Sequence, residues 1–310
     1  MRGPLFLNSL LGWASPAFLP VGTRSPSIAN LLIIISLAEI VLCCTDRKQS
    51  LRRGYELFFL GTGGLFLNTV DISPLTRKLS TFVALSANEL AVLERLYQCR
   101  RTFVAGQDLV EQGQSKQAAY ILASGWVCSY KIQPDGTRQI VDFQIPGDFL
   151  GLRSVLLRTS DHSFEPITQI QAAEVQAEEL LEAFATSPRL ATAVLWAASR
   201  DEAMVVEHLV GIGRRTSLAR MAHFMLELGA RLMLVGLGSR TGYACPLTQY
   251  HLADALGLSA VHVNRVLRQL RERGLVTFRD GWVTFDDHER LSELAGFDPA
   301  YLDQTGPLLR

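Results

Sequence analysis

The hydrophobic positions of residues 246–285 predict two short helices separated by a tight turn. Apolar residues recur at helical spacing in 252–256 and again in 263–270. Gly257 lies between these two runs, where the first helix must stop. A tight turn between helices commonly needs a positive φ, which glycine adopts without steric cost. The pattern therefore favours a helix-turn-helix.

Capping residues and a hairpin signal extend this pattern. Thr248 and Ser259 precede the two helical runs, and both residue types favour the N-cap position. The apolar runs 276–278 and 282–285 flank an Arg-Asp-Gly turn at residues 279–281, which is typical of a β-hairpin. We therefore expect the two helices to be followed by a β wing.

The second helix carries basic side chains on the face opposite its apolar stripe. Residues 260–273 contain four arginines and one glutamate, a local excess of three positive charges. Arginines neutralise phosphates, and side chains near the start of such a helix reach base edges in the major groove. Arg265 suits guanine and Asn264 suits adenine. The residues expected to contact DNA are Val261, His262, Asn264, Arg265, Arg268 and Arg271, together with Thr248 and Ser259. The alternative is an ordinary solvated charged face.

Upstream, residues 101–175 read as short strands. Glycines recur there at intervals that are mostly 11 or 12 residues, which indicates a small antiparallel barrel or sandwich. The runs 120–122, 125–130 and 140–145 are strand-like, with a strong Pro-Asp-Gly-Thr turn at 134–137. Before them, Ser86, followed three residues later by Glu89, predicts a capped helix that reaches Leu96.

Residues 189–212 return to the helical period and carry two apolar stripes. One stripe comprises Leu195, Ala198, Val205, Leu209 and Ile212, with Glu202 interrupting it. The other comprises Leu190, Val194, Ala197, Met204 and His208. A helix that is apolar on two sides needs two partners. We expect one stripe to pack on its own barrel and the other on a second subunit; the alternative is a helix buried within a monomer.

Residues 1–69 differ from the rest of the chain. Their apolar run, 28–44, has about 17 residues and contains Glu39, whereas a transmembrane helix needs about 20 apolar residues. A membrane anchor, a signal peptide and an unclassified extension are alternatives. The favoured interpretation is that the segment precedes the native start, because the sequence from Val70 resembles a fresh N-terminus.

The length of 310 residues predicts about two domains. Formal net charge is zero, so affinity for DNA must come from the local basic patch. The five cysteines are scattered, with no Cys-x-x-Cys pair and no metal-ligand spacing, which fits a reducing cytosol. No catalytic triad or paired-carboxylate pattern is evident. We therefore expect a cytoplasmic protein that is not an enzyme and holds no metal or cofactor.

The order of β-roll, long helix and winged helix-turn-helix resembles the Crp/Fnr family of bacterial transcription regulators. The most specific matches are residues 147–151 at the end of the roll, and 252–259 with 262–265 at the DNA end. The resemblance covers about residues 72–300. It implies an α+β fold with an N-terminal antiparallel β-roll or jelly-roll sensor domain, a long dimerisation helix and a C-terminal winged helix-turn-helix. It also implies a homodimer on a near-palindromic duplex DNA site, with RNA polymerase as a further partner.

The domain division that follows from the resemblance has five parts. They are an extension at 1–69, a cyclic-nucleotide-binding-like roll at 70–188, the dimerisation helix at 189–212, the winged helix-turn-helix at 213–300 and a tail at 301–310. A ligand-binding module whose winged helix contacts proteins is the alternative function, and a steep salt dependence of DNA binding would distinguish the two.

The resemblance also places an effector pocket in the roll. Its residues here are Gly147, Asp148, Gly151, Leu152, His162 and Ser163. In cyclic-AMP-binding members a glutamate holds the ribose where this chain has Leu152, and an Arg-Ser pair holds the phosphate where it has His162-Ser163. Leucine accepts no hydrogen bond and histidine lacks the bidentate fork of arginine. We therefore expect an unidentified effector other than cyclic AMP.

Two further departures from the family are visible. Oxygen-sensing members ligate an iron–sulfur cluster with four cysteines, which Cys99 and Cys128 alone cannot supply. The recognition helix has Ala260 and Val261 where well-known members have Arg and Glu, whereas Arg265 is retained. The DNA target is therefore expected to be related to the usual half-site but not identical to it.

Overall fold

A computed structural model of the chain describes residues 55–57, 67–69, 72–115, 118–153, 155 and 157–304. The chain divides into two compact units, Met1–Val70 and Asp71–Arg310. In the first unit, β1 (Tyr55–Leu57) pairs antiparallel with β2 (Leu67–Thr69). The elements that carry the candidate site all belong to the second unit.

Some expectations concern residues outside this described part. The apolar run 28–44, the start at Val70 and the last six residues of the tail lie there. None of the described helices is long and apolar enough to cross a membrane.

The roll consists of two antiparallel sheets with helices before and after them. The first sheet has the order β3 (Arg100–Phe103), β9 (Ile170–Val175), β4 (Ala119–Ser124), β7 (Phe149–Leu150). The second has the order β6 (Arg138–Gln144), β5 (Val127–Ile132), β8 (Ser163–Pro166). The helices are α2 (Pro74–Ser80) and α3 (Ala87–Gln98) before the sheets and α4 (Ala177–Thr186) after them. The expected antiparallel roll is confirmed.

The start of α3 follows the sequence signal. Ser86 Oγ accepts a hydrogen bond from Glu89 N at 3.3 Å, and Glu89 Oε2 accepts one from Ser86 N at 2.6 Å. This reciprocal capping box satisfies two backbone donors that the helix itself leaves unpaired. The helix continues to Gln98, two residues beyond the expected end.

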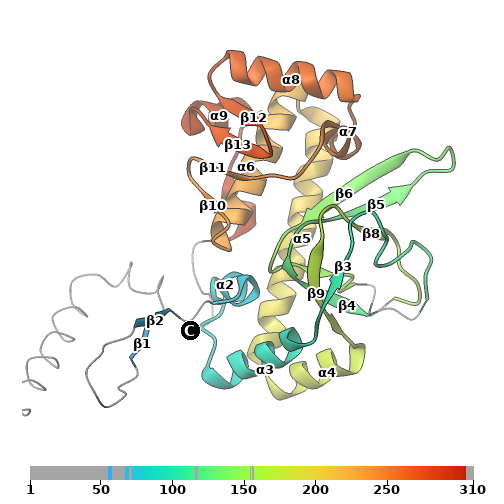
Figure 1. The fold of residues 1–310 in the computed structure, drawn as a ribbon, viewed down its shortest axis with the longest axis vertical. Helices are drawn as coiled ribbons and strands as arrows, with labels where there is room; N and C mark the ends of the chain where they lie inside the picture. Colours follow the sequence, from blue (N-terminus) through green and yellow to red (C-terminus); the bar gives the residue numbers. More distant parts are fainter. Residues whose placement is uncertain are drawn as a thin grey trace, which may run out of the picture. The chain divides into compact units, whose positions relative to one another are not determined.

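The long helix α5 (Pro188–Arg214) lies between the roll and α6 (Ser217–Leu234) (Figure 1). It is longer than predicted because Ser187 accepts a hydrogen bond from Leu190 N and Pro188 suits the first helical position. At its other end Thr216 caps Ala219 N, so α6 begins at Ser217.

The two stripes of α5 differ in exposure as expected. Leu190, Val194, Ala197 and Met204 are buried. Leu195 and Leu209 are 67% and 69% exposed, and Val205 and Ile212 are also exposed. One stripe therefore packs within this chain and the other has no partner within the part of the chain that the structure describes.

The winged helix domain contains one element that the sequence analysis missed. Its sheet has the order β10 (Gly238–Ser239), β11 (Gly242–Ala244), β13 (Trp282–Phe285), β12 (Val276–Arg279). The glycine-rich stretch 236–242 lies before the predicted helix-turn-helix, and with the residues that follow it forms a hairpin that joins the wing. Gly242 is required there because a Cβ at this position would overlap the carbonyl oxygen of Val283.

The remaining elements are helical. They are α7 (Gln249–Leu256), α8 (Ala260–Glu272), α9 (His288–Ala295) and η3 (Pro299–Leu302). Side chains of α6 to α8 and of the wing share a continuous apolar core with the roll side chains Trp126, Cys128, Tyr130, Ile140, Phe143 and Ile145. Phe143 and Phe224 meet at this boundary, with ring centroids 5.7 Å apart.

Candidate nucleic-acid interface

The helix-turn-helix is formed by α7 and α8 as the sequence predicted. Thr248 Oγ1 accepts a hydrogen bond from His251 N at 3.3 Å, and Ser259 Oγ accepts one from His262 N at 3.2 Å. Between the helices Gly257 adopts the left-handed conformation, with φ 63° and ψ 41°. The two hydroxyl groups thus have a structural role, since each satisfies a donor at a helix start.

Burial separates the two faces of α8. Its buried face consists of Val263, Val266 and Leu270, which fixes the helix against the domain core. The opposite face carries Val261, Asn264, Arg265, Arg268 and Arg271, all exposed. Val261 is 80% exposed, an unusual position for an aliphatic side chain on a well-packed domain.

The polar and basic side chains of this face differ in their intramolecular contacts. Arg268 Nε lies 3.6 Å from Glu272 Oε1 in an exposed pair, which contributes little to stability. Neither Arg265 nor Asn264 has an intramolecular side-chain partner among the described residues. Their polar groups are therefore available to phosphates and base edges without breaking an internal contact.

His262 does not lie on this face as expected. Its side chain is half-buried, and Nε2 lies 3.0 Å from Ser217 Oγ at the start of α6. The expectation that His262 lies on the basic face missed that the position before Val263 turns towards α6. The imidazole there contacts the partly buried hydroxyl of Ser217.

The β wing brings further exposed side chains to the domain surface. Asp280 and Gly281 both have positive φ, 52° and 73°, which is the geometry of a tight two-residue hairpin turn. Trp282 and Arg279 pair across this turn and both are exposed. Tyr250, at the start of α7, is also exposed. These three residues were not among the predicted DNA contacts, although an aromatic residue beside a hairpin turn, such as Trp282, was a usable signal.

The predicted effector residues lie on both sheets of the roll. Gly147, Asp148, Gly151 and Leu152 flank β7, whereas His162 and Ser163 stand at the start of β8. A cleft of about 590 Å³ opens between the roll and the winged helix, with Trp126, Pro146, Leu232 and Cys245 in its wall. None of the six predicted residues lines that cleft.

His162 and Ser163 already have partners within the chain. His162 Nδ1 lies 2.7 Å from Asp161 Oδ1, and burial lowers the pKa of the imidazole. Ser163 Oγ accepts a hydrogen bond from Gln112 N at 2.9 Å. A carboxylate beside the imidazole is an unfavourable neighbour for a bound phosphate.

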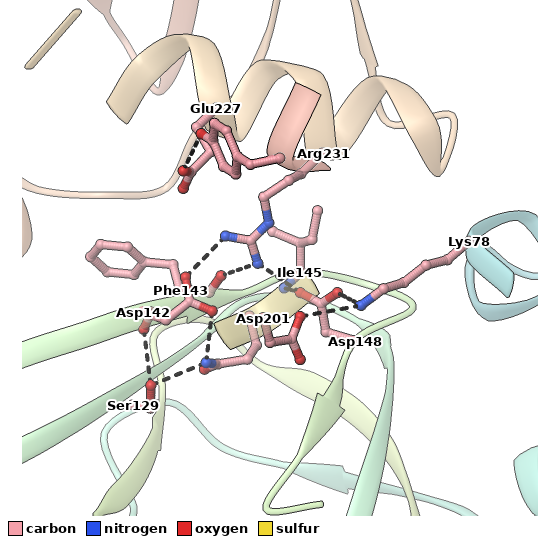
Figure 2. A network of polar contacts seen from close by, with 11 residues as sticks. Lys78, Ser129, Asp142, Phe143, Ile145, Asp148, Asp201, Glu227 and Arg231 are labelled. Atoms are coloured by element: carbon pink, nitrogen blue, oxygen red, sulfur yellow. Dashed lines mark hydrogen bonds and ion pairs between the residues drawn. The ribbon is translucent and has the colours of Figure 1, made fainter. Parts of the chain in front are cut away.

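Asp148 belongs to a buried ion network that joins the roll to the winged helix (Figure 2). Its Oδ1 lies 2.7 Å from Lys78 Nζ of α2, and its Oδ2 lies 2.9 Å from Arg231 Nη2 of α6. Burial opposes ionisation of this carboxyl, but Lys78, Arg231 and the Ile145 N–H outweigh it and hold its pKa well below the usual range. The carboxylate is thus occupied by structural partners.

Arg231 is the centre of this network. It is almost completely buried, and its Nη1 lies 3.0 Å from Asp142 Oδ1 while Nη2 also donates to the carbonyl oxygen of Phe143 at 2.8 Å. One planar guanidinium thereby binds β6 and the following turn to α6. We name the group of Lys78, Asp142, Asp148 and Arg231 the junction network.

A buried acid lies one turn before Arg231. Glu227 Oε2 accepts a hydrogen bond from the Tyr301 hydroxyl at 2.6 Å, which joins η3 to α6. Burial raises the pKa of Glu227 to about 7, although Arg231 and Tyr301 act in the opposite direction. The folded protein therefore retains a proton on Glu227 at pH values where the unfolded chain has lost it.

The pH dependence of stability should reveal this proton. Because its pKa is raised, Glu227 contributes a penalty to folding that grows as pH rises from about 4.5 to about 7. Glu227→Gln should remove the penalty. As pH rises from 5 to 8, the free energy of unfolding of the variant should therefore increase by about 1–3 kcal/mol relative to that of wild type. Urea unfolding at both pH values measures this difference. A constant difference between the two proteins would contradict it, and the exposed Glu293→Gln is the control.

The described residues contain no group of three or more His, Cys, Asp or Glu side chains placed to hold a metal ion. Burial raises the pKa of the Cys128 and Cys245 thiols to about 12, which suppresses the reactive thiolate. Cys99 is exposed and carries a free thiol.

Comparisons with known proteins agree with this architecture. Residues 219–294 match a model of the Crp-like helix-turn-helix domain, and residues 100–187 match a model of the cyclic nucleotide-binding domain. The nitrogen fixation regulation protein FixK of Bradyrhizobium diazoefficiens is 30% identical over 213 residues, which cover 68% of this chain and 88% of the relative. The fumarate and nitrate reduction regulatory protein of Vibrio cholerae is 23% identical over 235 residues, which cover 76% and 93%.

A solved structure shows the same fold. The structure of FixK2 from Bradyrhizobium japonicum matches with a TM-score of 0.58 and 26% identity, covering 64% of this chain and 98% of that one. The match spans nearly the whole of the solved protein, so the order of roll, long helix and winged helix is common to both. With its sensor roll and its helix-turn-helix, the chain belongs to the Crp/Fnr family of transcription regulators.

Proposed function

We propose that the protein regulates transcription as a homodimer that binds a near-palindromic DNA site through α8. The observation that carries this proposal is the exposed face of α8, on which Arg265 and Asn264 have no side-chain partner among the described residues. Such a face suits phosphate neutralisation by arginine and bidentate contacts to base edges. The partners are duplex DNA, a second copy of this chain and RNA polymerase, the last on the family relationship alone, and the compartment is the cytoplasm.

The exposed stripe of α5 supports the dimer. Leu195, Val205, Leu209 and Ile212 are all exposed. With Glu202 counted at the interrupted position, these positions recur at intervals of seven, three, four and three residues. A sustained apolar stripe of this kind is typical of helices that pair side by side. Parallel pairing would place two copies of α8 about 34 Å apart, which is one turn of DNA.

The signal is proposed to be something other than cyclic AMP. Leu152 offers the ribose no acceptor, and His162 is buried beside Asp161, with Nδ1 and Oδ1 2.7 Å apart. Phosphate binding there would have to displace or neutralise this carboxylate. No catalytic activity is proposed.

The DNA target is best identified by selection from a random duplex pool, followed by fluorescence anisotropy titrations at several salt concentrations. Binding to the selected site should weaken steeply as salt rises, because arginines on the phosphates release counterions. Salt-independent binding, or the absence of any selected sequence, would leave the winged helix as a protein-contact module and overturn the proposal.

Arg265 gives a sharper test. Arg265→Ala should weaken binding to the selected site by about 1–3 kcal/mol and relax the preference at one base pair in each half-site. Arg101→Ala is the matched control, since it removes another exposed positive charge, on β3 and outside the winged helix. Equal losses in the two variants, or unchanged base preference in Arg265→Ala, would show that Arg265 does not contact a base.

A further inference from the structure

Arg220, on the first turn of α6, makes four hydrogen bonds to backbone carbonyl oxygens. Its Nε donates to Gly211 O at 2.8 Å, and its Nη2 donates to Ile212 O at 2.9 Å, both in the last turn of α5. The same Nη2 donates to Arg215 O at 3.2 Å. Its Nη1 donates to Leu256 O, at 2.5 Å, at the end of α7. One guanidinium therefore binds the C-terminal ends of two helices.

The chemistry of helix ends explains this arrangement. The last carbonyl groups of a helix have no intrahelical donor and carry the negative end of the helix dipole. A guanidinium satisfies several of them at once, and its planar, rigid fork fixes the directions along which they approach. Lysine would supply the charge but not the fixed geometry.

The last turn of α5 needs such a constraint. It contains Gly211 and Gly213, and glycine is among the weakest helix formers because it loses much conformational freedom on folding. A Cβ at Gly213 would meet nothing within 4 Å, and the nearest atoms to one at Gly211 belong to the side chains of Arg215 and Arg220. The contacts from Arg220 link this weak turn directly to the end of α7.

A second contact acts across the same joint. His262 Nε2 lies 3.0 Å from Ser217 Oγ, which ties the start of α8 to the start of α6. By contrast, among the described residues the side chain of Arg215 bonds to α5 alone, with Nη1 on the carbonyl oxygen and Nη2 on the carboxylate of Glu207. Arg215 thus carries the same charge as Arg220 and lies in the same connection between α5 and α6. Among the described residues its side chain forms no hydrogen bond with α7 or α8.

We propose that Arg220 is a positioning residue that sets the angle between α5 and the helix-turn-helix, and thereby the half-site spacing that the dimer accepts. This inference rests on the proposed function, because α5 is the helix that would pair with its copy. If α5 fixes the two-fold axis and α8 enters the major groove, the joint between them determines the separation of the two recognition helices.

The test uses the full chain and a series of duplexes in which the selected half-sites are moved by −2 to +2 base pairs. Each base pair shifts a half-site by about 3.4 Å and rotates it by about one tenth of a turn. Wild type should bind one spacing at least about tenfold more tightly than its neighbours. Arg220→Gln should reduce that ratio to about threefold or less, with its affinity for the shifted sites maintained.

Two variants separate positioning from folding. Arg220→Lys, which keeps the charge, should fall between wild type and Arg220→Gln, and Arg215→Gln should keep the wild-type ratio. Circular dichroism confirms that each variant is folded, since unfolding would weaken binding at every spacing alike. A wild-type ratio in Arg220→Gln, or an equal loss in Arg215→Gln, would overturn the inference. Failure of wild type to bind any selected duplex would instead refute the proposed function.

Discussion

Arg231→Ala is expected to lower the free energy of unfolding by about 3–5 kcal/mol, because it removes one partner from the buried junction network. Asp148, whose side chain is only 7% exposed, would then keep Lys78 but lose the 2.9 Å contact to Arg231 Nη2. The carbonyl oxygen of Phe143 would lose its donor as well. Urea unfolding at pH 7, followed by circular dichroism, measures the change.

The control for this prediction is an exposed ion pair. Arg268→Ala removes the pair with Glu272, in which both side chains are about two-thirds exposed, and should cost no more than about 1 kcal/mol. Arg231→Lys should fall between, since an ammonium group retains a positive charge but cannot reach all three acceptors at once. If Arg231→Ala cost as little as Arg268→Ala, the junction network would not be a stabilising element of the fold.

The second large effect concerns the exposed stripe of α5. The double variant Leu195→Glu, Leu209→Glu should remain folded but become monomeric, with affinity for the selected palindrome reduced at least about 100-fold. Burial of a leucine contributes about 1.5–3 kcal/mol, and a symmetric interface would lose four of them and bring like charges together. Sedimentation equilibrium measures the oligomeric state and fluorescence anisotropy measures DNA binding.

Leu181→Glu is the matched control for the stripe. Leu181, on α4, is 58% exposed, similar to Leu195 and Leu209, but it lies outside α5. Its replacement should leave both the mass of the particle and the DNA affinity at wild-type values. A double variant that still sediments as a dimer would place the interface elsewhere, and a wild-type protein that sediments as a monomer would contradict the dimer itself.

The parts of the fold that could be predicted from the sequence are those set by neighbouring residues. The capping hydroxyls of Thr248 and Ser259, the left-handed Gly257 and the Asp280-Gly281 turn each act within four residues of chain. Local hydrogen bonds and φ preferences are sufficient to specify such features. The predictions of the helix-turn-helix, the wing and the two faces of α5 were correct for this reason.

The interactions that were missed connect distant residues. Arg231 meets Asp142 and Asp148 at separations of 89 and 83 residues, and Arg220 meets Leu256 at a separation of 36. In the sequence, both arginines are flanked by apolar residues of α6. This local pattern does not indicate whether an arginine extends to solvent or to a buried carboxylate. Only the packing of α6 on β6, α5 and α7 decides this.

His262 was misplaced for the same reason. Its position on α8 is next to the buried stripe, so a change of a few tens of degrees in helix orientation decides whether it faces DNA or α6. Its bond to Ser217 settles that orientation. Short strands present a different difficulty: β10 and β11 have two and three residues, too few to show an alternating pattern.

The apolar core shared by the roll and the winged helix has a consequence for how the molecule loses its structure. Trp126, Phe143 and Ile145 of the roll pack in the same cluster as Met225 and Leu228 of α6. Separating the two modules would expose both halves of this cluster to water, at a cost that grows with the apolar area uncovered. The roll and the winged helix are therefore expected to unfold in one cooperative transition. Truncation between α5 and α6 would accordingly give two aggregation-prone fragments and not two independently folded domains.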